Sequence, residues 1–301
     1  MNDEYDLLVL SAAPLGDVPW YFRLGRFLSR HKIRGGDRLL SALRRHGLLD
    51  RLVEYRVSRD VRLRVPLWRP CNQWLPTDVQ NYEAAFMRAL CTAIRQLHQP
   101  VTFVDCGADI GTVSAHVVAR CPNISRIIAF EPNLAAFHVL AANLRTLGVP
   151  AEARCVAVGD FNGRGRLVSP SHDPSAHAMY VERTEDGPIE IEQVDALDLA
   201  AGRPTVIKID VEGSEPEVVR GAQNTIRNAG DVIVAFEAHP KVAMRTATDP
   251  LGIVEELRRL RPDFVFEVDT SPPTPLRTDV PFFDQFPPTR VYNIVARSIA
   301  R

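Results

Sequence analysis

Two carboxylates with a glycine turn between them form the part of this chain best suited to chemistry. An apolar run ends in Asp105, and a turn with Gly107, Asp109 and Gly111 follows it. A second apolar run ends in Glu131, 26 positions after Asp105. In a strand–turn–helix–strand unit, an acid at about this spacing accepts hydrogen bonds from ribose hydroxyls. The segment therefore predicts a site for an adenosine-containing cofactor.

The spacing of the glycines and the acids around them indicate which cofactor. Dinucleotide sites read G-x-G-x-x-G and bring bare backbone N–H groups against a pyrophosphate. Here Gly107 and Gly111 give G-x-x-x-G, with Asp105 and Asp109 close by. Carboxylates suit a ligand that carries an ammonium and a sulfonium, which favours S-adenosylmethionine. An NAD-dependent dehydrogenase is the less favoured alternative.

The elements around these residues would bring their side chains to one edge of a sheet. From Val101 onward, apolar runs of strand length alternate with helical patterns, which predicts an α/β fold with a mostly parallel sheet and helices on both faces. The expected strands are 101–105, 127–130, 153–158, 206–210, 232–237, 264–268 and 291–295. Asp105, Glu131, Asp210 and Glu237 fall at carboxyl ends of strands, where such sheets bind ligands.

The first part of the chain reads differently. Residues 1–98 predict helices and one short hairpin, with a helix that starts at Thr77 or Asp78 and runs through Tyr82 to Leu97. We therefore divide the chain into a helical N-terminal region, 1–98, and a cofactor-binding domain, 99–301. The N-terminal region could cover the acceptor or mediate a homo-oligomer, and the role of residues 1–77 stays open.

Composition excludes several classes of protein. The 301 residues carry a net charge of −1, and without a basic tail or stripe we expect no nucleic-acid binding. No apolar run approaches the ~20 residues of a membrane span. The acidic start MNDEYD argues against a signal peptide. Five cysteines without paired spacing fit a cytoplasmic protein better than a disulfide or zinc framework.

Several motifs resemble one known family. In chain order they are VDCGADIG at 104–111, FEPN at 130–133, VGD at 158–160, IKIDVEG at 207–213 and EAHP at 237–240. This order is similar to that of FkbM-family methyltransferases, over roughly residues 78–297. The resemblance implies a Rossmann-like class I methyltransferase fold, with seven strands of which the last is antiparallel, here with a helical N-terminal extension. It also implies S-adenosylmethionine-dependent O-methylation of a sugar or secondary metabolite. Asp109 stands where the family often has Asn.

The expected cofactor-binding residues follow the same motifs. They are Asp105, Gly107, Ala108, Asp109, Gly111, Glu131, Pro132, Val158, Asp160 and Asp210. The first loop would hold the methionine part of the donor and Glu131 the ribose. Asp160 would contact the adenine amine, although a plain turn residue explains it about as well.

Three residues are catalytic candidates: His239, Asp210 and Lys208. Methyl transfer needs an aligned acceptor oxygen and a group that takes its proton. His239 is the first candidate for this base, because the ordinary pKa of histidine lies near the working pH. Lys208 lies within an apolar strand, so we expect it to pair with Asp105 or Glu237 and shape the floor of the pocket.

Other features stay open at this point. His172 and His177 rank below His239 as bases. Asp210, Glu212 and Glu237 offer the oxygen ligands that Mg²⁺ prefers, so a magnesium site is an alternative to a metal-free site. The loops 169–188 and 270–289 are expected to form the acceptor pocket. A protein that binds the donor without catalysis is a further alternative.

Overall fold

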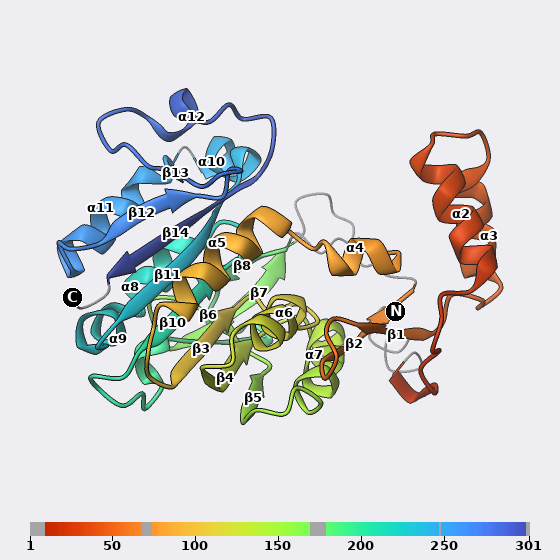
Figure 1. The fold of residues 1–301 in the computed structure, drawn as a ribbon, viewed down its shortest axis with the longest axis horizontal. Coiled ribbons are helices and arrows are strands. Elements are labelled where there is room, and N and C mark those ends of the chain that lie inside the picture. Colours follow the sequence, from red (N-terminus) through yellow and green to blue (C-terminus); the bar gives the residue numbers. More distant parts are fainter. Residues whose placement is uncertain (1–9, 68–73, 169–178, 247, 299–301) are drawn as a thin grey trace.

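The computed structural model describes residues 10–67, 74–168, 179–246 and 248–298, and it is built around one twisted sheet (Figure 1). The sheet has eight strands in the order β13-β12-β14-β11-β10-β3-β4-β5. Their bounds are β3 Val101–Cys106, β4 Ile124–Phe130, β5 Ala151–Arg154, β10 Thr205–Ile209, β11 Val232–Ala238, β12 Val265–Val268, β13 Thr274–Pro275 and β14 Tyr292–Ser298. β14 runs antiparallel to both β11 and β12, as the resemblance implied. The sheet has the seven strands that the resemblance implied, although not all with the expected bounds, and the two-residue β13 adds an eighth at the edge.

Helices cover both faces of this sheet. One face packs against α5 (Ala84–Arg95), α6 (Thr112–Arg120) and α7 (Leu134–Leu144). The other packs against α8 (Glu215–Arg220), α9 (Gln223–Asn228) and α11 (Leu251–Leu260). The central strands β3 and β10 are buried almost throughout, which explains their largely apolar sequence. The remaining short helices are η2 Val194–Ala196, α10 Pro240–Thr246 and α12 Phe282–Gln285.

The expected third strand, 153–158, is wrong as one element. The chain leaves the main sheet after β5 and enters a second sheet of four strands in the order β6-β9-β7-β8. Their bounds are β6 Ala157–Val158, β7 Gly163–Val168, β8 Tyr180–Arg183 and β9 Ile189–Glu192. Both halves satisfy the same strand pattern, so the local sequence does not mark the change of partner.

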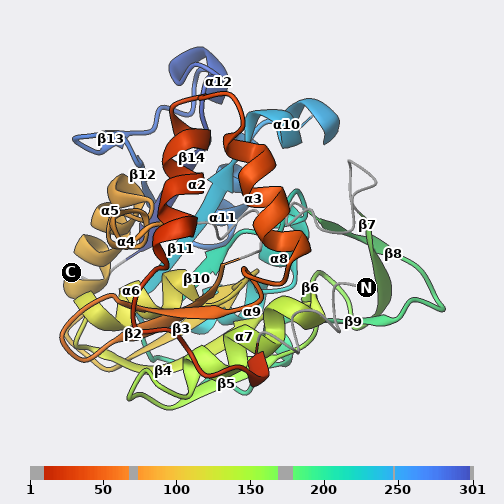
Figure 2. The same ribbon diagram turned by 90° about the vertical axis from the view of Figure 1, so that its right-hand side faces the viewer.

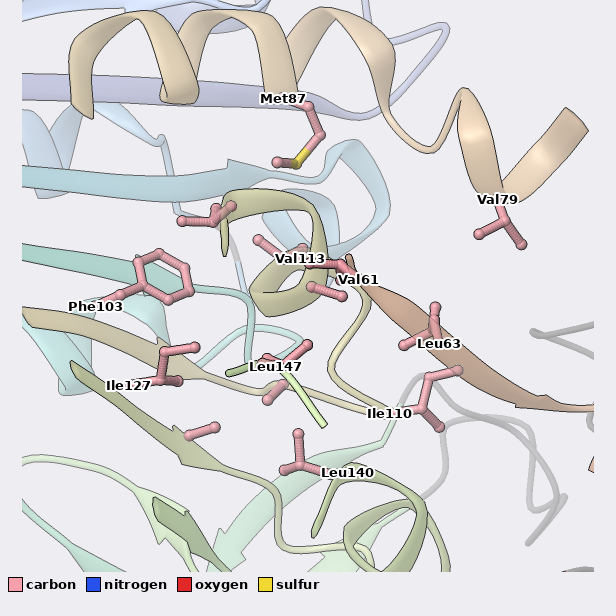
Figure 3. Packing of buried hydrophobic residues seen from close by; sticks show 14 of the residues in the cluster. Val61, Leu63, Val79, Met87, Phe103, Ile110, Val113, Ile127, Leu140 and Leu147 are labelled. Carbon is pink, nitrogen blue, oxygen red and sulfur yellow. The ribbon is translucent and has the colours of Figure 1, made fainter. Parts of the chain in front are cut away.

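In the N-terminal region, α2 (Trp20–Arg30) and α3 (Gly36–Arg45) pack against each other away from the sheet (Figures 1 and 2). The hairpin of β1 (Leu52–Arg56) and β2 (Arg62–Pro66) instead joins the core: Figure 3 shows Val61 and Leu63 beside Val113 and Ile110. Asn143 of α7 fastens it by bonding both backbone groups of Arg64. No helix in the described ranges is long and apolar enough to span a membrane.

The single helix expected from Thr77 or Asp78 to Leu97 is also wrong. It is divided into α4 (Pro76–Gln80) and α5, and Glu83 between them has the left-handed backbone φ of 39°. The break turns residues 82 and 83 toward the carboxyl edge of the sheet, with consequences for the site below.

Candidate functional site

A cavity of about 300 Å³ opens at the carboxyl ends of the central strands. Its acidic lining residues are Glu83, Asp109, Glu131, Asp210, Glu212 and Glu237. Apolar and aromatic lining residues include Trp74, Tyr82, Phe130, Val158, Leu167 and Met179. The volume suits a small-molecule ligand. The carboxylates that end β4, β10 and β11 meet here, as their places in the sequence predicted.

The cavity is strongly acidic. Six of its lining residues carry carboxyl groups, and no lysine, arginine or histidine is among those that the structure describes there. Burial, and then the negative charge of Asp210, raise the pKa of Glu212 to about 7. Burial, and then the same negative charge of Asp210, raise the pKa of Glu83 to about 7 as well. Burial followed by Asp210 and Glu212 raises the pKa of Glu237 strongly. Such a site attracts cations.

Backbone strain is concentrated in the same place. Four non-glycine residues of the described chain have a positive φ, and three of them line the cavity. They are Glu83, Asp109 and Glu212, with φ of 39°, 47° and 58°. A non-glycine residue in this conformation costs of order 1–3 kcal/mol and persists where the surroundings fix it, often at functional sites.

Glu131 is fixed by the backbone around it. Its Oε2 accepts a hydrogen bond from the Asp109 N–H at 2.9 Å, and its Oε1 accepts one from the Asn133 N–H at 2.8 Å. These bonds tie the end of β4 to the glycine turn and to the start of α7. The carboxylate is therefore held in one orientation at the cavity wall.

An ion pair lies below the cavity floor. Lys208 Nζ is 3.2 Å from Asp105 Oδ1 and 3.4 Å from Asp210 Oδ2, and it donates to the Gly107 carbonyl at 2.7 Å. Burial opposes the charged amine, but the two carboxylates outweigh it, and the pKa of Lys208 is raised. Ser114 donates to the other oxygen of Asp105 at 2.7 Å. The expected pairing of Lys208 with Asp105 is confirmed.

Not every residue expected at the cofactor reaches the cavity. Gly107, Asp109, Glu131, Pro132, Val158 and Asp210 line it, whereas Asp105, Ala108, Gly111 and Asp160 do not. Asp105 is fully buried beneath the floor. Asp160 instead accepts a hydrogen bond from Arg220 Nε at 3.1 Å.

The expected base, His239, lies outside the cavity lining. Its Nδ1 accepts a hydrogen bond from the Lys241 N–H at 3.1 Å, at the start of α10. Burial, and then the charge of Lys241, lower its pKa. Its catalytic role stays a prediction. His172 and His177 fall outside the described residues.

Of the two loops expected to form the acceptor pocket, one reaches the cavity and the other does not. Leu167, Met179 and Val181 bring the neighbourhood of loop 169–188 to the cavity, although residues 169–178 lie outside the described chain. No described lining residue comes from loop 270–289. Its Phe282 and Phe286 are buried in the core beside Tyr292. These aromatic residues therefore pack in the core of the domain and do not line this cavity.

Sequence reasoning missed the contribution of residues before α5. Tyr82 and Glu83 line the cavity at the break between α4 and α5, and Trp74, just ahead of α4, lines it as well. The signal that could have found them is an acidic residue next to a tyrosine ahead of the first central strand. Among the described residues, no three His, Cys, Asp or Glu side chains are arranged to hold a metal ion. The alternative magnesium site of Asp210, Glu212 and Glu237 therefore has no geometric support.

Comparison with known proteins agrees with this arrangement. A family model for the methyltransferase FkbM domain matches residues 105–268. The hexuronic acid methyltransferase AglP of Haloferax volcanii is 28% identical over 138 residues, which are 44% of this chain and 55% of AglP. The chain thus spans about half the length of this relative.

Two solved structures are similar at lower identity. The FkbM methyltransferase of Methylobacillus flagellatus KT is 21% identical, with 65% of this chain and 43% of that one covered and a TM-score of 0.44. A precorrin-6y C5,15-methyltransferase of Geobacter metallireducens GS-15 is 17% identical, with 70% and 88% covered and a TM-score of 0.38. The family model covers more than half of the sequence, including the glycine turn, five of the six acidic cavity residues and Lys208, so this chain belongs to the FkbM methyltransferase family.

Proposed function

We propose that this methyltransferase uses S-adenosylmethionine to methylate a hydroxyl group of a sugar. The acidity of the cavity carries the proposal, because six acidic side chains without a basic lining residue suit a donor with a sulfonium and an ammonium. A pyrophosphate would be repelled there, which disfavours an NAD-dependent dehydrogenase. The similarity to a hexuronic acid methyltransferase supports a sugar acceptor over another secondary metabolite.

The cavity walls fit the parts of this donor. Glu131 would accept hydrogen bonds from the ribose hydroxyls, and the Asp109 and Asn133 N–H groups hold its carboxylate in place beforehand. Phe130 and Val158 offer apolar surface to the adenine. The donor, when bound, supplies an electrophilic methyl carbon on its sulfur. The acidic residues stabilise the positive charge, and the cavity must align the acceptor oxygen in line with that carbon.

Two kinds of residue compete for the role of base. His239 is the candidate from the sequence. Its Nδ1 accepts a backbone hydrogen bond, so its other ring nitrogen, Nε2, would have to reach the acceptor from outside the cavity lining. Glu212 lines the cavity, and its pKa of about 7 is near that of an efficient base at neutral pH. We infer that Glu212 is the stronger candidate, and that Asp210 and Lys208 position the floor below it.

We further propose that residues 1–98 cover the acceptor side of the domain formed by residues 99–301. Trp74 and Tyr82, on either side of α4, contribute aromatic surface to the cavity. Aromatic side chains commonly stack on the apolar faces of sugar rings, which have large hydrophobic area and a polar rim. This arrangement would place the acceptor between α4 and the carboxyl edge of the sheet.

Calorimetry and a methylation assay test the function. Purified protein should bind S-adenosylmethionine and its demethylated product saturably and should not bind NADH, and Glu131→Ala should weaken the first two. Neutral hexosides, uronosides and hydroxylated secondary metabolites should then be compared by release of the demethylated product. NADH binding without donor binding would indicate a dehydrogenase. Donor binding without turnover on any acceptor class would indicate a non-catalytic binding protein.

A further inference from the structure

The helices α2 and α3 expose an unusual surface. Trp20, Leu24 and Phe27 lie along one side of α2, at spacings of four and three residues, and are 74%, 43% and 53% exposed. Ile33, in the connection to α3, is 45% exposed. Residues of this size and type are normally buried in a helix pair. Here a different side of α2, with Phe22, is the buried one.

Positive charge is concentrated in the same two helices and the turn between them. Between residues 20 and 45 there are eight basic residues and one acid, Asp37, although the whole chain has a net charge of −1. Seven of the eight basic residues are exposed. They are Arg23, Arg30, Lys32, Arg34, Arg38, Arg44 and Arg45. The expectation that the chain has no basic stripe is therefore wrong. It rested on the net charge of the whole chain, in which acidic residues elsewhere cancel the positive charge of this segment.

The helix pair is a defined unit. Gly25 of α2 faces Leu40 of α3 so closely that a Cβ there would lie 2.6 Å from the leucine Cδ2. Arg30 forms an ion pair with Asp78 of α4, the helix between the two aromatic cavity residues. Figure 2 shows the pair in front of the body of the molecule. The exposed side chains are thus presented by a packed scaffold.

We propose that the α2–α3 pair docks the protein on the surface of a membrane that contains anionic lipids. Exposed tryptophan, leucine and phenylalanine insert at the boundary between headgroups and acyl chains, and arginines beside them pair with lipid phosphates. Apolar and basic side chains together are what a helix needs to bind at a membrane surface. Such binding needs no helix that spans the membrane.

Two other partners fit the surface less well. A second copy that used the same face would bring two strongly positive helix pairs together, which opposes a symmetric dimer through it. A nucleic acid would satisfy the arginines but would leave Leu24 and Ile33 without an apolar partner. An anionic bilayer satisfies both kinds of side chain. It would also hold α4 and the cavity residues beside it close to the lipid surface.

Flotation of the full chain with vesicles tests the proposal. Vesicles of phosphatidylcholine that contain about 30% of the anionic lipid phosphatidylglycerol should bind the protein. Vesicles of pure phosphatidylcholine should bind it at least tenfold less. Trp20→Ser with Phe27→Ser, and separately Arg34→Glu with Arg38→Glu, should each reduce binding at least tenfold. Matched controls are Met244→Ser, at an exposed methionine of α10, and Arg259→Glu, at an exposed arginine of α11, which should bind as the unaltered chain does.

Folding and the alternative partners are measured on the same samples. Thermal unfolding and donor affinity should be unchanged in all four variants. If a double variant does not fold, quenching of tryptophan fluorescence by brominated lipid in the unaltered chain decides, and its absence overturns the proposal. Equal binding to both vesicle types also overturns it. So does a dimer in sedimentation that Trp20→Ser with Phe27→Ser abolishes, or retention of an RNA oligonucleotide with no retention of vesicles.

Discussion

The ion pair under the cavity floor allows a prediction of stability from geometry. Lys208 is 5% exposed in its side chain and Asp105 is fully buried, with 3.2 Å between Nζ and Oδ1. Lys208→Met would leave the Asp105 carboxylate buried without this cation. Removing one partner of a buried pair costs about 3–5 kcal/mol, and the lost hydrogen bond to the Gly107 carbonyl costs about 1 kcal/mol more. We therefore expect the free energy of unfolding to fall by roughly 4 kcal/mol or more at pH 7.

Denaturant unfolding followed by circular dichroism measures this loss. The double variant Lys208→Met with Asp105→Asn removes the orphaned charge, so it should recover at least about half of the loss. Arg166→Met is a matched control, because Arg166 pairs with Glu182 at 2.6 Å with both side chains well exposed. A surface pair contributes about 0–1 kcal/mol, so this control should change little.

The double variant also separates the charge from simple packing. Asp105→Asn removes the buried charge and leaves the gap of the lysine stem unchanged, so recovery in the double variant would show that the charge causes the loss. A loss below about 1 kcal/mol at pH 7 would contradict the reasoning, since that is the size expected of an exposed pair. An equal loss in the single and the double variant would attribute the effect to packing of the lysine stem.

Three further predictions concern the site and its supports. Glu131→Ala should weaken donor binding at least tenfold by calorimetry, whereas His239→Ala should leave it unchanged; the reverse order would exchange their assigned roles. If Glu212 is the base, kcat/KM should rise with pH through about 7, where the Glu212 carboxyl ionises. The variant Glu212→Gln should not show this rise. A rise that lies wholly below pH 6.5 would instead point to His239, whose pKa is lowered. Asn143→Ala removes bonds to both backbone groups of Arg64 and to the Ile110 carbonyl, so unfolding should need about 2–3 kcal/mol less; a loss under about 0.5 kcal/mol would show that the β1–β2 hairpin does not depend on it.

The central strands and their terminal acids could be predicted because the signal is local. A buried parallel strand reads as a continuous apolar run, and the carboxylate that follows it lies at the ligand edge whatever the loops do. Asp210 and Glu131 were placed correctly at the cavity on this ground alone. The division of 153–158 between two sheets depends on which strands are nearby, and that information is not in the segment itself.

The missed features share a different cause, which is that long-range contacts decide them. The pattern from Tyr82 to Leu97 is apolar at helical spacing on both sides of Glu83, so nothing local marks the break that turns Glu83 into the cavity. The aromatic residues of 270–289 suit an acceptor pocket as well as a core, and only the fold shows that Phe282 and Phe286 pack inward. The exposed side of α2 likewise looks like a core-facing stripe until the structure shows what α3 covers.

Charge connects the floor of the site to its walls. Lys208 supplies one positive charge beneath the cavity, and Asp105 and Asp210 are the two carboxylates in contact with it. Glu212 and Glu237, at neighbouring strand ends, have mainly negative neighbours, and burial together with that negative charge raises their pKa values. A ligand that brings positive charge into the cavity would therefore favour the ionised form of these groups. By linkage, raising the pH through 7 should favour both an ionised Glu212 and a cationic donor beside it, so a single arrangement of charges could bind the donor and prepare a base for its acceptor.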